Sequence, residues 1–291
     1  MRVFYRILLR IYLFLTSFLS APLIRFFSRV IGWVLYISKN DQKKITSSNL
    51  GVVFGYNNKK LNEVTFDSLV HSSASLLESG LVWRNMPYAN NLNIEVEGFE
   101  EIQNSLNKNK GLILFTPHHG NIEVLLNFLG RNTDCMVPYT KVKNPELEQI
   151  VLSAREDMGV NMVKSDLAGV RAMLKFLKEG KTIAIASDQV PEKSGGIVSP
   201  FFLKEVFTMT LVARLVAKIK CPVHSVVCLR NDNMNGYKLF FSTAIGGMDN
   251  DISSGVNIMN QELEKCIMRA PEQYAWEYKI FKKSSLKDIY K

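Results

Sequence analysis

Short apolar runs, each about the length of a β-strand, alternate with helix-like segments along most of this chain. The runs are "GLILFT" (111–116), "CMVPY" (135–139), "VNMV" (160–163), "TIAIAS" (182–187) and "PVHSVVCL" (222–229). Helical patterns are expected at about 145–158, 167–179 and 208–219, with a loop before the last of them. Strands that are apolar on both faces are typical of parallel sheets covered by helices on both sides. The chain is therefore predicted to be an α/β protein with a mostly parallel central sheet.

Weaker patterns extend this alternation at both ends. "LNIEVEG" (92–98) alternates apolar and polar residues, as a strand does, and precedes a helix at about 100–108. A long helix is expected over 57–83, where apolar residues recur with a period near 3.6. "YKLFFSTA" (237–244) adds a late strand, parallel or antiparallel, and a final helix ends at "APEQYAWEYKIFKK". No internal repeat or low-complexity linker interrupts residues 41–291, which are predicted to form one domain.

The first forty residues suggest a membrane anchor. Between Ile11 and Ile24 there is no charged residue, and these fourteen residues would span roughly 21 Å as a helix. A bilayer core is about 30 Å thick. Arg2, Arg6 and Arg10 recur every four residues and would form one basic stripe on that helix. We expect residues 1–40 to tilt through the bilayer or to lie in its interface.

Two other interpretations of these forty residues stay open. "SFLSAP" (17–22) offers the small-residue exit of a cleaved secretory signal, although Pro22 would follow the cut and apolar, basic sequence continues beyond it. A buried core helix is the second alternative, and three arginines on one stripe would be unusual there. Arginine and lysine residues that flank the segment favour the cytoplasmic side of a membrane.

The charge of the chain points to an anionic partner. Its formal net charge is +9, which suits an anionic membrane surface or an acidic protein. Nucleic acid is not expected, because no zinc-finger spacing and no RNP-like run is present. The four cysteines are scattered without a CxxC pair, which fits a reducing compartment.

Two of the four histidines stand side by side in "TPHHGNIEVLLNFLG" (116–130), directly after a predicted strand. Ligands bind at the carboxyl ends of strands in open α/β sheets, so His118 and His119 should lie at that edge. A general-base histidine needs a carboxylate on its other ring nitrogen, and Glu123 is the nearest in sequence. His119 can pair with Glu123 on one helical face, whereas His118 reaches it only if the loop folds back.

Spacing alone leaves this segment open between a catalytic site and a capped, hydrogen-bonded start of a helix. Gly120 allows the sharp turn that either interpretation needs. The first amides of the helix are free to hold an anion or a developing oxyanion. A zinc site is not expected, since HExxH is absent and no third ligand stands in a motif.

"HHGNIE" (118–123) has the H-x4-D/E form of the glycerolipid acyltransferase superfamily and resembles its lipid A lauroyl/myristoyl acyltransferase branch. The resemblance covers most of the chain. Besides the N-terminal segment, it includes "SSNLGVVFG" (47–55), "YTKVKNPELEQIVLSARE" (139–156), "SDQVPEKSGGIVSPFF" (187–202) and "PEQYAWEYKIFK" (271–282). The chain departs from the branch at Ile122, where tryptophan is usual, at Gly55, where proline is usual, and at "FFLKE".

The resemblance implies an O-acyltransferase on the cytoplasmic face of a bacterial inner membrane. A fatty acyl chain would pass from acyl carrier protein, or from acyl-coenzyme A, to a hydroxyl of a lipid A precursor. His118 would be the general base and Glu123 would orient it. Arg155 and Asp188 match family positions that would bind substrate phosphate or brace the site, and Asn121 would bind substrate or shape the turn. No metal and no cofactor is implied.

Three alternatives to the lipid A acyltransferase hypothesis stay open. The departures from the family pattern allow the same chemistry on another glycolipid or on a lysophospholipid. A non-catalytic, basic membrane-binding protein is the alternative from a different class. A small-molecule thioester hydrolase is a further possibility, although no G-x-S-x-G elbow supports a serine version.

Overall fold

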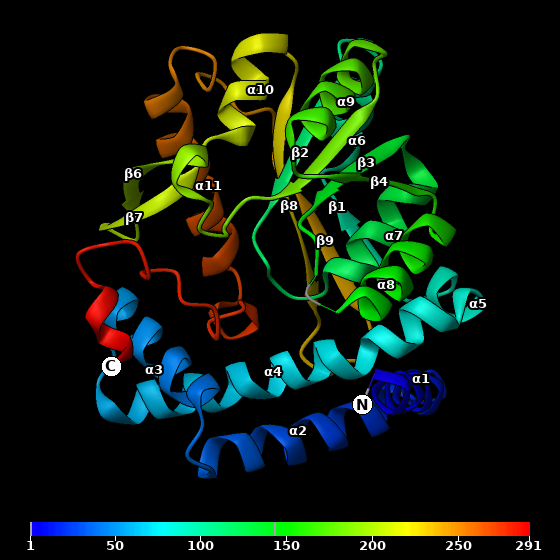
Figure 1. Ribbon diagram of the computed structural model, residues 1–291, viewed down its shortest axis with the longest axis vertical. Coiled ribbons are helices and arrows are strands. Elements are labelled where there is room, and N and C mark those ends of the chain that lie inside the picture. Colours follow the sequence, from blue (N-terminus) through cyan, green and yellow to red (C-terminus); the bar gives the residue numbers. More distant parts are fainter. Residues whose placement is uncertain (1, 143) are drawn as a thin grey trace.

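The computed structural model describes residues 2–142 and 144–291, with the side chains of 2–6 and 193 left out. A seven-stranded sheet forms its centre (Figure 1). In spatial order its strands are β1 (Ile94–Glu97), β9 (Tyr237–Phe241), β8 (Val223–Arg230), β2 (Leu112–Thr116), β5 (Thr182–Ala186), β3 (Cys135–Tyr139) and β4 (Val160–Lys164). All neighbours are parallel except β8 and β9, which are antiparallel. The predicted α/β class and the mostly parallel sheet are confirmed.

Helices cover both faces of this sheet, as the apolar strands require. In chain order the helices are α1 (Arg2–Thr16), α2 (Ala21–Ile37), α3 (Asp41–Phe54), α4 (Asn58–Arg84), α5 (Met86–Asn90), α6 (Phe99–Leu106), α7 (Ile122–Asn132), α8 (Pro145–Asp157), α9 (Leu167–Lys178), α10 (Leu211–Ile219) and α11 (Ile252–Met268). Short 3-10 turns lie at η1 (Lys193–Gly195), η2 (Pro271–Gln273) and η3 (Lys287–Tyr290).

Strand β2 shows how one segment serves two cores. Its five residues are all buried. Ile113 and Phe115 belong to the core under α9, α10 and α11. Leu112 and Leu114 belong to the core under α6 and α7. Successive side chains of a strand point to opposite faces, so a strand buried on both faces must be apolar at every position.

Helix α4 crosses the end of the domain where β2 and β8 finish, with α1 and α2 outside it (Figure 1). Two glycines allow the close helix contacts. A Cβ at Gly80 of α4 would lie 1.8 Å from the hydroxyl oxygen of Thr16, and one at Gly32 of α2 would lie 2.6 Å from a methyl carbon of Val70. The N-terminal helices are therefore packed lengthwise on the domain rather than separated from it.

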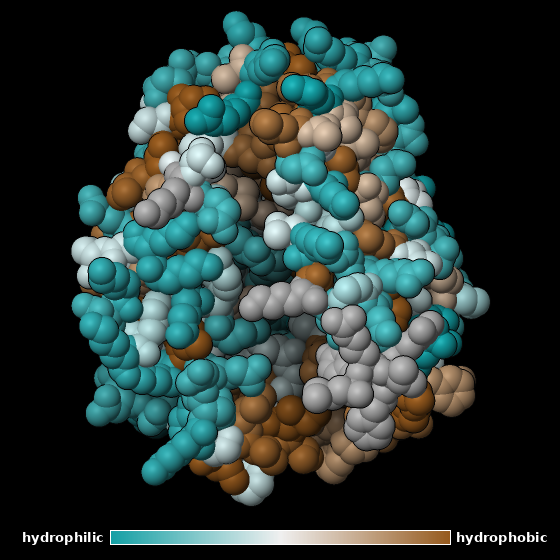
Figure 2. Space-filling model, in the orientation of Figure 1, coloured by the Kyte–Doolittle hydropathy of each residue, from teal (hydrophilic) through white to brown (hydrophobic). Residues whose placement is uncertain are grey.

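The outward surface of α1 and α2 is apolar. Its exposed large apolar side chains are Ile7, Leu8, Ile11, Phe14, Leu15, Phe18, Leu23, Phe26, Phe27, Val30, Trp33, Val34 and Ile37. Figure 2 shows apolar atoms gathered at the lower end of the molecule, where Figure 1 draws α2. In the part of the chain that the structure describes, no single helix could cross a membrane by length and composition, and only α2 with α3, bent by 85°, passes as a pair. The side chains of Arg2 and Arg6, two members of the expected basic stripe, lie outside the described residues.

One expected loop is a β-hairpin. Strands β6 (Gly196–Phe201) and β7 (Lys204–Met209) pair antiparallel, so α10 begins at Leu211 rather than near Thr208. The turn uses Phe202 and Leu203 with φ of 47° and 60°. Two-residue hairpin turns with positive φ at both positions normally contain glycine or asparagine. Because this turn contains neither, no local pattern predicted the hairpin.

Candidate active site

The histidine segment forms a loop at the carboxyl edge of the sheet, between the end of β2 and the start of α7. Gly120 has a φ of 65°, which favours glycine. A Cβ at this position would also lie 1.9 Å from the carbonyl oxygen of Cys228 in β8. The amide of Asn121 donates to that same carbonyl at 2.9 Å. The loop therefore lies directly against β8, and only glycine permits this approach.

The two adjacent histidines have different surroundings. His119 is 1% exposed, and its Nε2 lies 2.7 Å from the carbonyl oxygen of Ala270. Burial lowers the pKa of His119 to about 4. The side chain of His118 is 36% exposed. His119 is thus a buried, neutral packing residue, and His118 is the histidine that a substrate can reach.

His118 is held by Asp188. The Nδ1 of His118 lies 2.6 Å from one carboxylate oxygen of Asp188, and the backbone amide of His118 donates to the other oxygen at 2.9 Å. Asp188 follows β5, and Thr116 at the end of β2 is paired in register with Ala186 at the end of β5. His118 and Asp188 therefore follow neighbouring parallel strands and lie at the same edge of the sheet. The Nε2 of His118 faces the side-chain amide of Gln189 at 3.4 Å.

The charges around His118 favour its protonated form. Burial lowers the pKa of His118, but the charge and hydrogen bond of Asp188 raise it more, so the pKa lies above its usual value. Arg155 acts against this rise and Glu277, which accepts a hydrogen bond from Ser72 at 3.0 Å, acts with it. Burial raises the pKa of Asp188, but His118 outweighs this effect and the pKa is lowered.

The expected pair of His118 and Glu123 is not formed among the described residues. Helix α7 begins at Ile122, so Glu123 lies in its first turn and its carboxylate faces α4 and α8. It accepts from the indole nitrogen of Trp83 at 2.9 Å and from the guanidinium of Arg155 at 2.6 and 3.2 Å. His118 lies in the preceding loop, where Asp188 occupies its Nδ1. The orienting carboxylate is therefore corrected from Glu123 to Asp188.

Asn121 faces the interior of the protein. Its side-chain oxygen accepts from the amide of Val124 at 3.0 Å and caps α7, as such residues do at helix starts. Its side-chain nitrogen donates to Glu78 at 2.7 Å. Asn121 is 4% exposed. Of its two expected roles, the contacts match the one that shapes the turn.

Several neighbours of the site carried no signal in the sequence. Trp83, Glu78 and Arg230, from α4 and β8, stand in no motif, and Gln273 and Glu277 lie in the segment "PEQYAWEYKIFK" after α11 but had been given no role. Only the three-dimensional packing brings them to the loop. Asp188 was indicated by the family resemblance, and its place directly after a buried parallel strand also puts it at the ligand-binding edge.

A half-exposed histidine, paired through Nδ1 with a buried carboxylate at the carboxyl edge of a parallel sheet, is the arrangement of an α/β enzyme that uses a general base. The chain belongs to the bacterial lipid A biosynthesis acyltransferases, because the model of that family matches residues 1–283. It is accordingly an acyltransferase of lipid A biosynthesis. The resemblance seen in "HHGNIE" and the later segments is confirmed at the level of the family.

Individual relatives agree with this assignment. A lipid A biosynthesis palmitoleoyltransferase of Escherichia coli (strain K12) is 26% identical over 269 residues, which cover 91% of this chain and 86% of that protein. A lipid A biosynthesis lauroyltransferase of the same strain is 24% identical over 245 residues, covering 82% and 78%. A lipid A biosynthesis acyltransferase of Haemophilus influenzae (strain ATCC 51907 / DSM 11121 / KW20 / Rd) is 24% identical over 270 residues, covering 91% and 86%.

Proposed function

We propose that this enzyme transfers a fatty acyl chain from acyl carrier protein, or from acyl-coenzyme A, to a hydroxyl of a lipid A precursor. His118 acts as the general base. The observation that carries this assignment is the 2.6 Å contact between the Nδ1 of His118 and Asp188, which leaves Nε2 as the basic nitrogen on the accessible side of the ring. A carboxylate on Nδ1 selects the tautomer that can accept a proton at Nε2.

The reaction is an acyl transfer in which a carbon–oxygen bond forms and a carbon–sulfur bond breaks. Nε2 of His118 takes the proton of the acceptor hydroxyl while the hydroxyl oxygen attacks the carbonyl carbon of the thioester. Asp188 stabilises the imidazolium that forms. When the tetrahedral intermediate collapses, the thiolate of the carrier leaves and receives the proton from His118. The ester product and a free thiol balance the step.

Backbone amides at the start of α7 are suited to the oxyanion of the intermediate. In the loop itself, the amides of His118, Gly120 and Asn121 donate to acceptors within the protein. The first amides of a helix have no partner inside the helix, and its N-terminus carries a partial positive charge. We assign the oxyanion to the amides of Ile122 and Glu123, the first two residues of α7.

Arg155, which is paired with Glu123, is proposed to bind a phosphate group of the donor or the acceptor. Their side chains are 19% and 15% exposed, so the pair sits at the border of the site. Glu123 engages Nε and Nη2 of Arg155. Arginine binds phosphate and carboxylate through the same planar set of donors. The Nη1 of Arg155 takes no part in the two contacts with Glu123. Asn121 is assigned an indirect role, through the shape of the loop.

We place the enzyme on the cytoplasmic face of the inner membrane, with α1 and α2 lying in the interface. Their outward apolar side chains, together with Arg10, Arg25 and Arg29, give the composition of an interfacial helix pair. Helix α4 links this surface to the histidine loop, since Ser75 of α4 donates to the carbonyl oxygen of Gly120 at 3.2 Å. A lipid acceptor would therefore meet the site from the membrane side.

Serine substitutions at Phe14, Phe18, Phe26 and Trp33 test this placement. These side chains are 53%, 69%, 60% and 54% exposed, so their loss should leave the thermal unfolding temperature nearly unchanged. Binding to anionic phospholipid vesicles should weaken by at least about tenfold, because each buried aromatic side chain contributes roughly 1.5–3 kcal/mol. Leu167→Ser is the matched control, since Leu167 is 80% exposed at the start of α9, away from α1 and α2. Wild-type vesicle binding by the quadruple variant would contradict the placement.

The reaction itself is tested by mass spectrometry of the lipids of a deletion strain. The bacterium without this gene should contain lipid A that lacks one acyl chain, and expression of the gene should restore it. The mass difference identifies the transferred chain. Unchanged lipid A together with an altered phospholipid would mean that the acceptor is a lysophospholipid. Unchanged lipids throughout would favour a protein that binds membranes without catalysis.

A further inference from the structure

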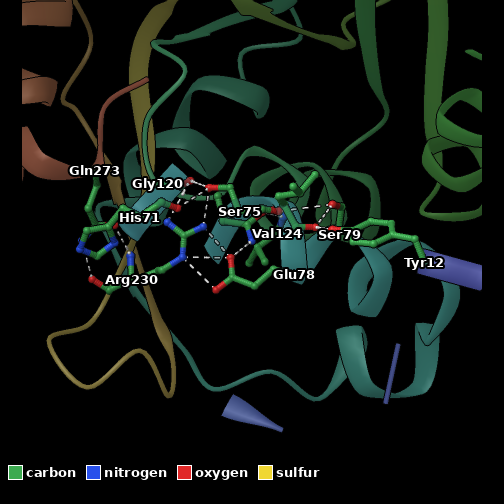
Figure 3. A network of polar contacts seen from close by, with 11 residues as sticks. Tyr12, His71, Ser75, Glu78, Ser79, Gly120, Val124, Arg230 and Gln273 are labelled. Atoms are coloured by element: carbon green, nitrogen blue, oxygen red, sulfur yellow. Dashed lines mark hydrogen bonds and ion pairs between the residues drawn. The ribbon is translucent and has the colours of Figure 1, made fainter. Parts of the chain in front are cut away.

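A buried ion pair lies beneath the histidine loop (Figure 3). Glu78 of α4 and Arg230 at the end of β8 have side chains that are 3% and 1% exposed. The Nε of Arg230 lies 2.8 and 2.9 Å from the two carboxylate oxygens, and Nη2 lies 2.5 Å from the second. The reaction described above uses neither residue.

The pair holds the loop from the side of α4. The Nη1 of Arg230 donates to the carbonyl oxygen of Gly120 at 3.2 Å, and Nη2 donates to the hydroxyl of Ser75 at 2.7 Å. Ser75 in turn donates to the carbonyl oxygen of Gly120 (Figure 3). The side-chain amide of Asn121 donates to the carboxylate of Glu78. The peptide between Gly120 and Asn121 is therefore fixed by charged partners on this side.

A second set of contacts holds the loop from the side of η2. The amide of Gly120 donates to the carbonyl oxygen of Gln273 at 2.9 Å. The side chain of Gln273 exchanges two hydrogen bonds of 2.9 Å with the backbone of Arg230. The amide of Ala275 donates to the carbonyl oxygen of His118 at 3.0 Å. Arg230 thus contacts the loop and both elements that enclose it.

Stability alone does not account for such a pair. Removing two charges from water costs about as much as their attraction returns, and well-packed apolar residues often serve equally well in their place. A buried, fully hydrogen-bonded ion pair does impose one geometry on the groups that it contacts. Here those groups belong to Gly120 and Asn121, two of the three residues between His118 and helix α7.

We propose that Glu78 and Arg230 are positioning residues that keep the His118 ring on Asp188. This inference rests on the proposed role of His118 as the base. His118 and Asp188 come from different strands, so their 2.6 Å contact exists only while the loop keeps its place on β8. A displacement of about 1 Å in a catalytic group can lower a rate by about 100-fold.

Arg230→Lys and Ser75→Ala test the proposal in the full-length enzyme. Lysine keeps the charge that balances Glu78 but lacks the planar donors that reach Gly120 and Ser75 together. We expect kcat to fall by at least about tenfold in Arg230→Lys and by a smaller factor in Ser75→Ala, with KM within about twofold of wild type in both. Ser73→Ala is the matched control, because Ser73 lies buried in the same helix and its hydroxyl donates to the carbonyl oxygen of Leu69.

The pH profile of kcat separates positioning from a loss of folded protein. A loosened contact with Asp188 should move the acidic limb of the profile to lower pH, whereas a smaller folded fraction lowers the whole profile without moving it. The limb and kcat of Ser73→Ala should match wild type. If Ser75→Ala and Arg230→Lys both keep the wild-type limb while His118→Asn is inactive, the positioning role is wrong and the base assignment stands. Full activity of His118→Asn would instead remove the base assignment on which the positioning role rests.

Discussion

The His118→Asn enzyme should transfer acyl chains about 10²–10⁴-fold more slowly than wild type, which is the contribution of a positioned general base. Asparagine has nearly the shape of the imidazole near the backbone but has no basic nitrogen, so KM should change little. The side chain of His118 is 36% exposed, but its loss removes a partner of the buried Asp188 carboxylate, so a moderate loss of stability is also expected. Initial rates with acyl carrier protein thioesters and a lipid A precursor, together with a thermal unfolding curve, check both statements.

The neighbouring histidine provides the control for this variant. His119→Asn removes the contact between Nε2 and the carbonyl oxygen of Ala270 in a fully buried position. It should lower the free energy of unfolding by about 1–3 kcal/mol, the usual cost of leaving a buried group without its partner. The kcat per folded molecule should stay within about tenfold of wild type, far from the loss at His118. Similar rates in the two variants would contradict the assignment of His118 as the base.

The fold could be predicted where local pattern and burial agree. "GLILFT", "TIAIAS" and "CMVPY" became β2, β5 and β3 because a strand buried on two faces must be apolar at each position. The hairpin of β6 and β7 could not be predicted, since its turn residues, Phe202 and Leu203, are not typical of turns. The order of strands was also out of reach, because pairing between β2, β5 and β8 depends on contacts between distant segments.

The candidate site, too, could be predicted from the sequence only in part. The strand pattern placed His118 and His119 at the ligand-binding edge, and the family resemblance selected His118 over His119 and pointed to Asp188. Their pairing was missed, since they are 70 residues apart and Glu123 is close in sequence. Local spacing describes a helix face well, but His118 lies before the helix, where the neighbouring strand decides its partner. Glu78 and Arg230, 152 residues apart, had no local pattern at all.

Asp188→Asn should lower kcat by about 10²–10⁴-fold and also change its pH dependence. Only the neutral imidazole can take a proton, so the rate rises as pH passes through the pKa of His118. Burial lowers this pKa, and Asp188 raises it above its usual value. In Asp188→Asn the carboxylate charge is lost. Burial and Arg155 still lower the pKa of His118, while Glu277 still raises it. The pKa of His118 should therefore fall, and the acidic limb should move to lower pH.

Asp188→Glu separates the charge of this residue from its position. The longer side chain keeps the negative charge but cannot keep both the 2.6 Å contact to Nδ1 and the 2.9 Å contact to the backbone amide in a position that is 5% exposed. Its acidic limb should therefore stay closer to wild type than that of Asp188→Asn, although kcat falls. An Asp188→Asn enzyme with the wild-type limb would mean that the ionisation seen in the profile belongs to another group. The proton of the acceptor hydroxyl would then go to a base other than His118.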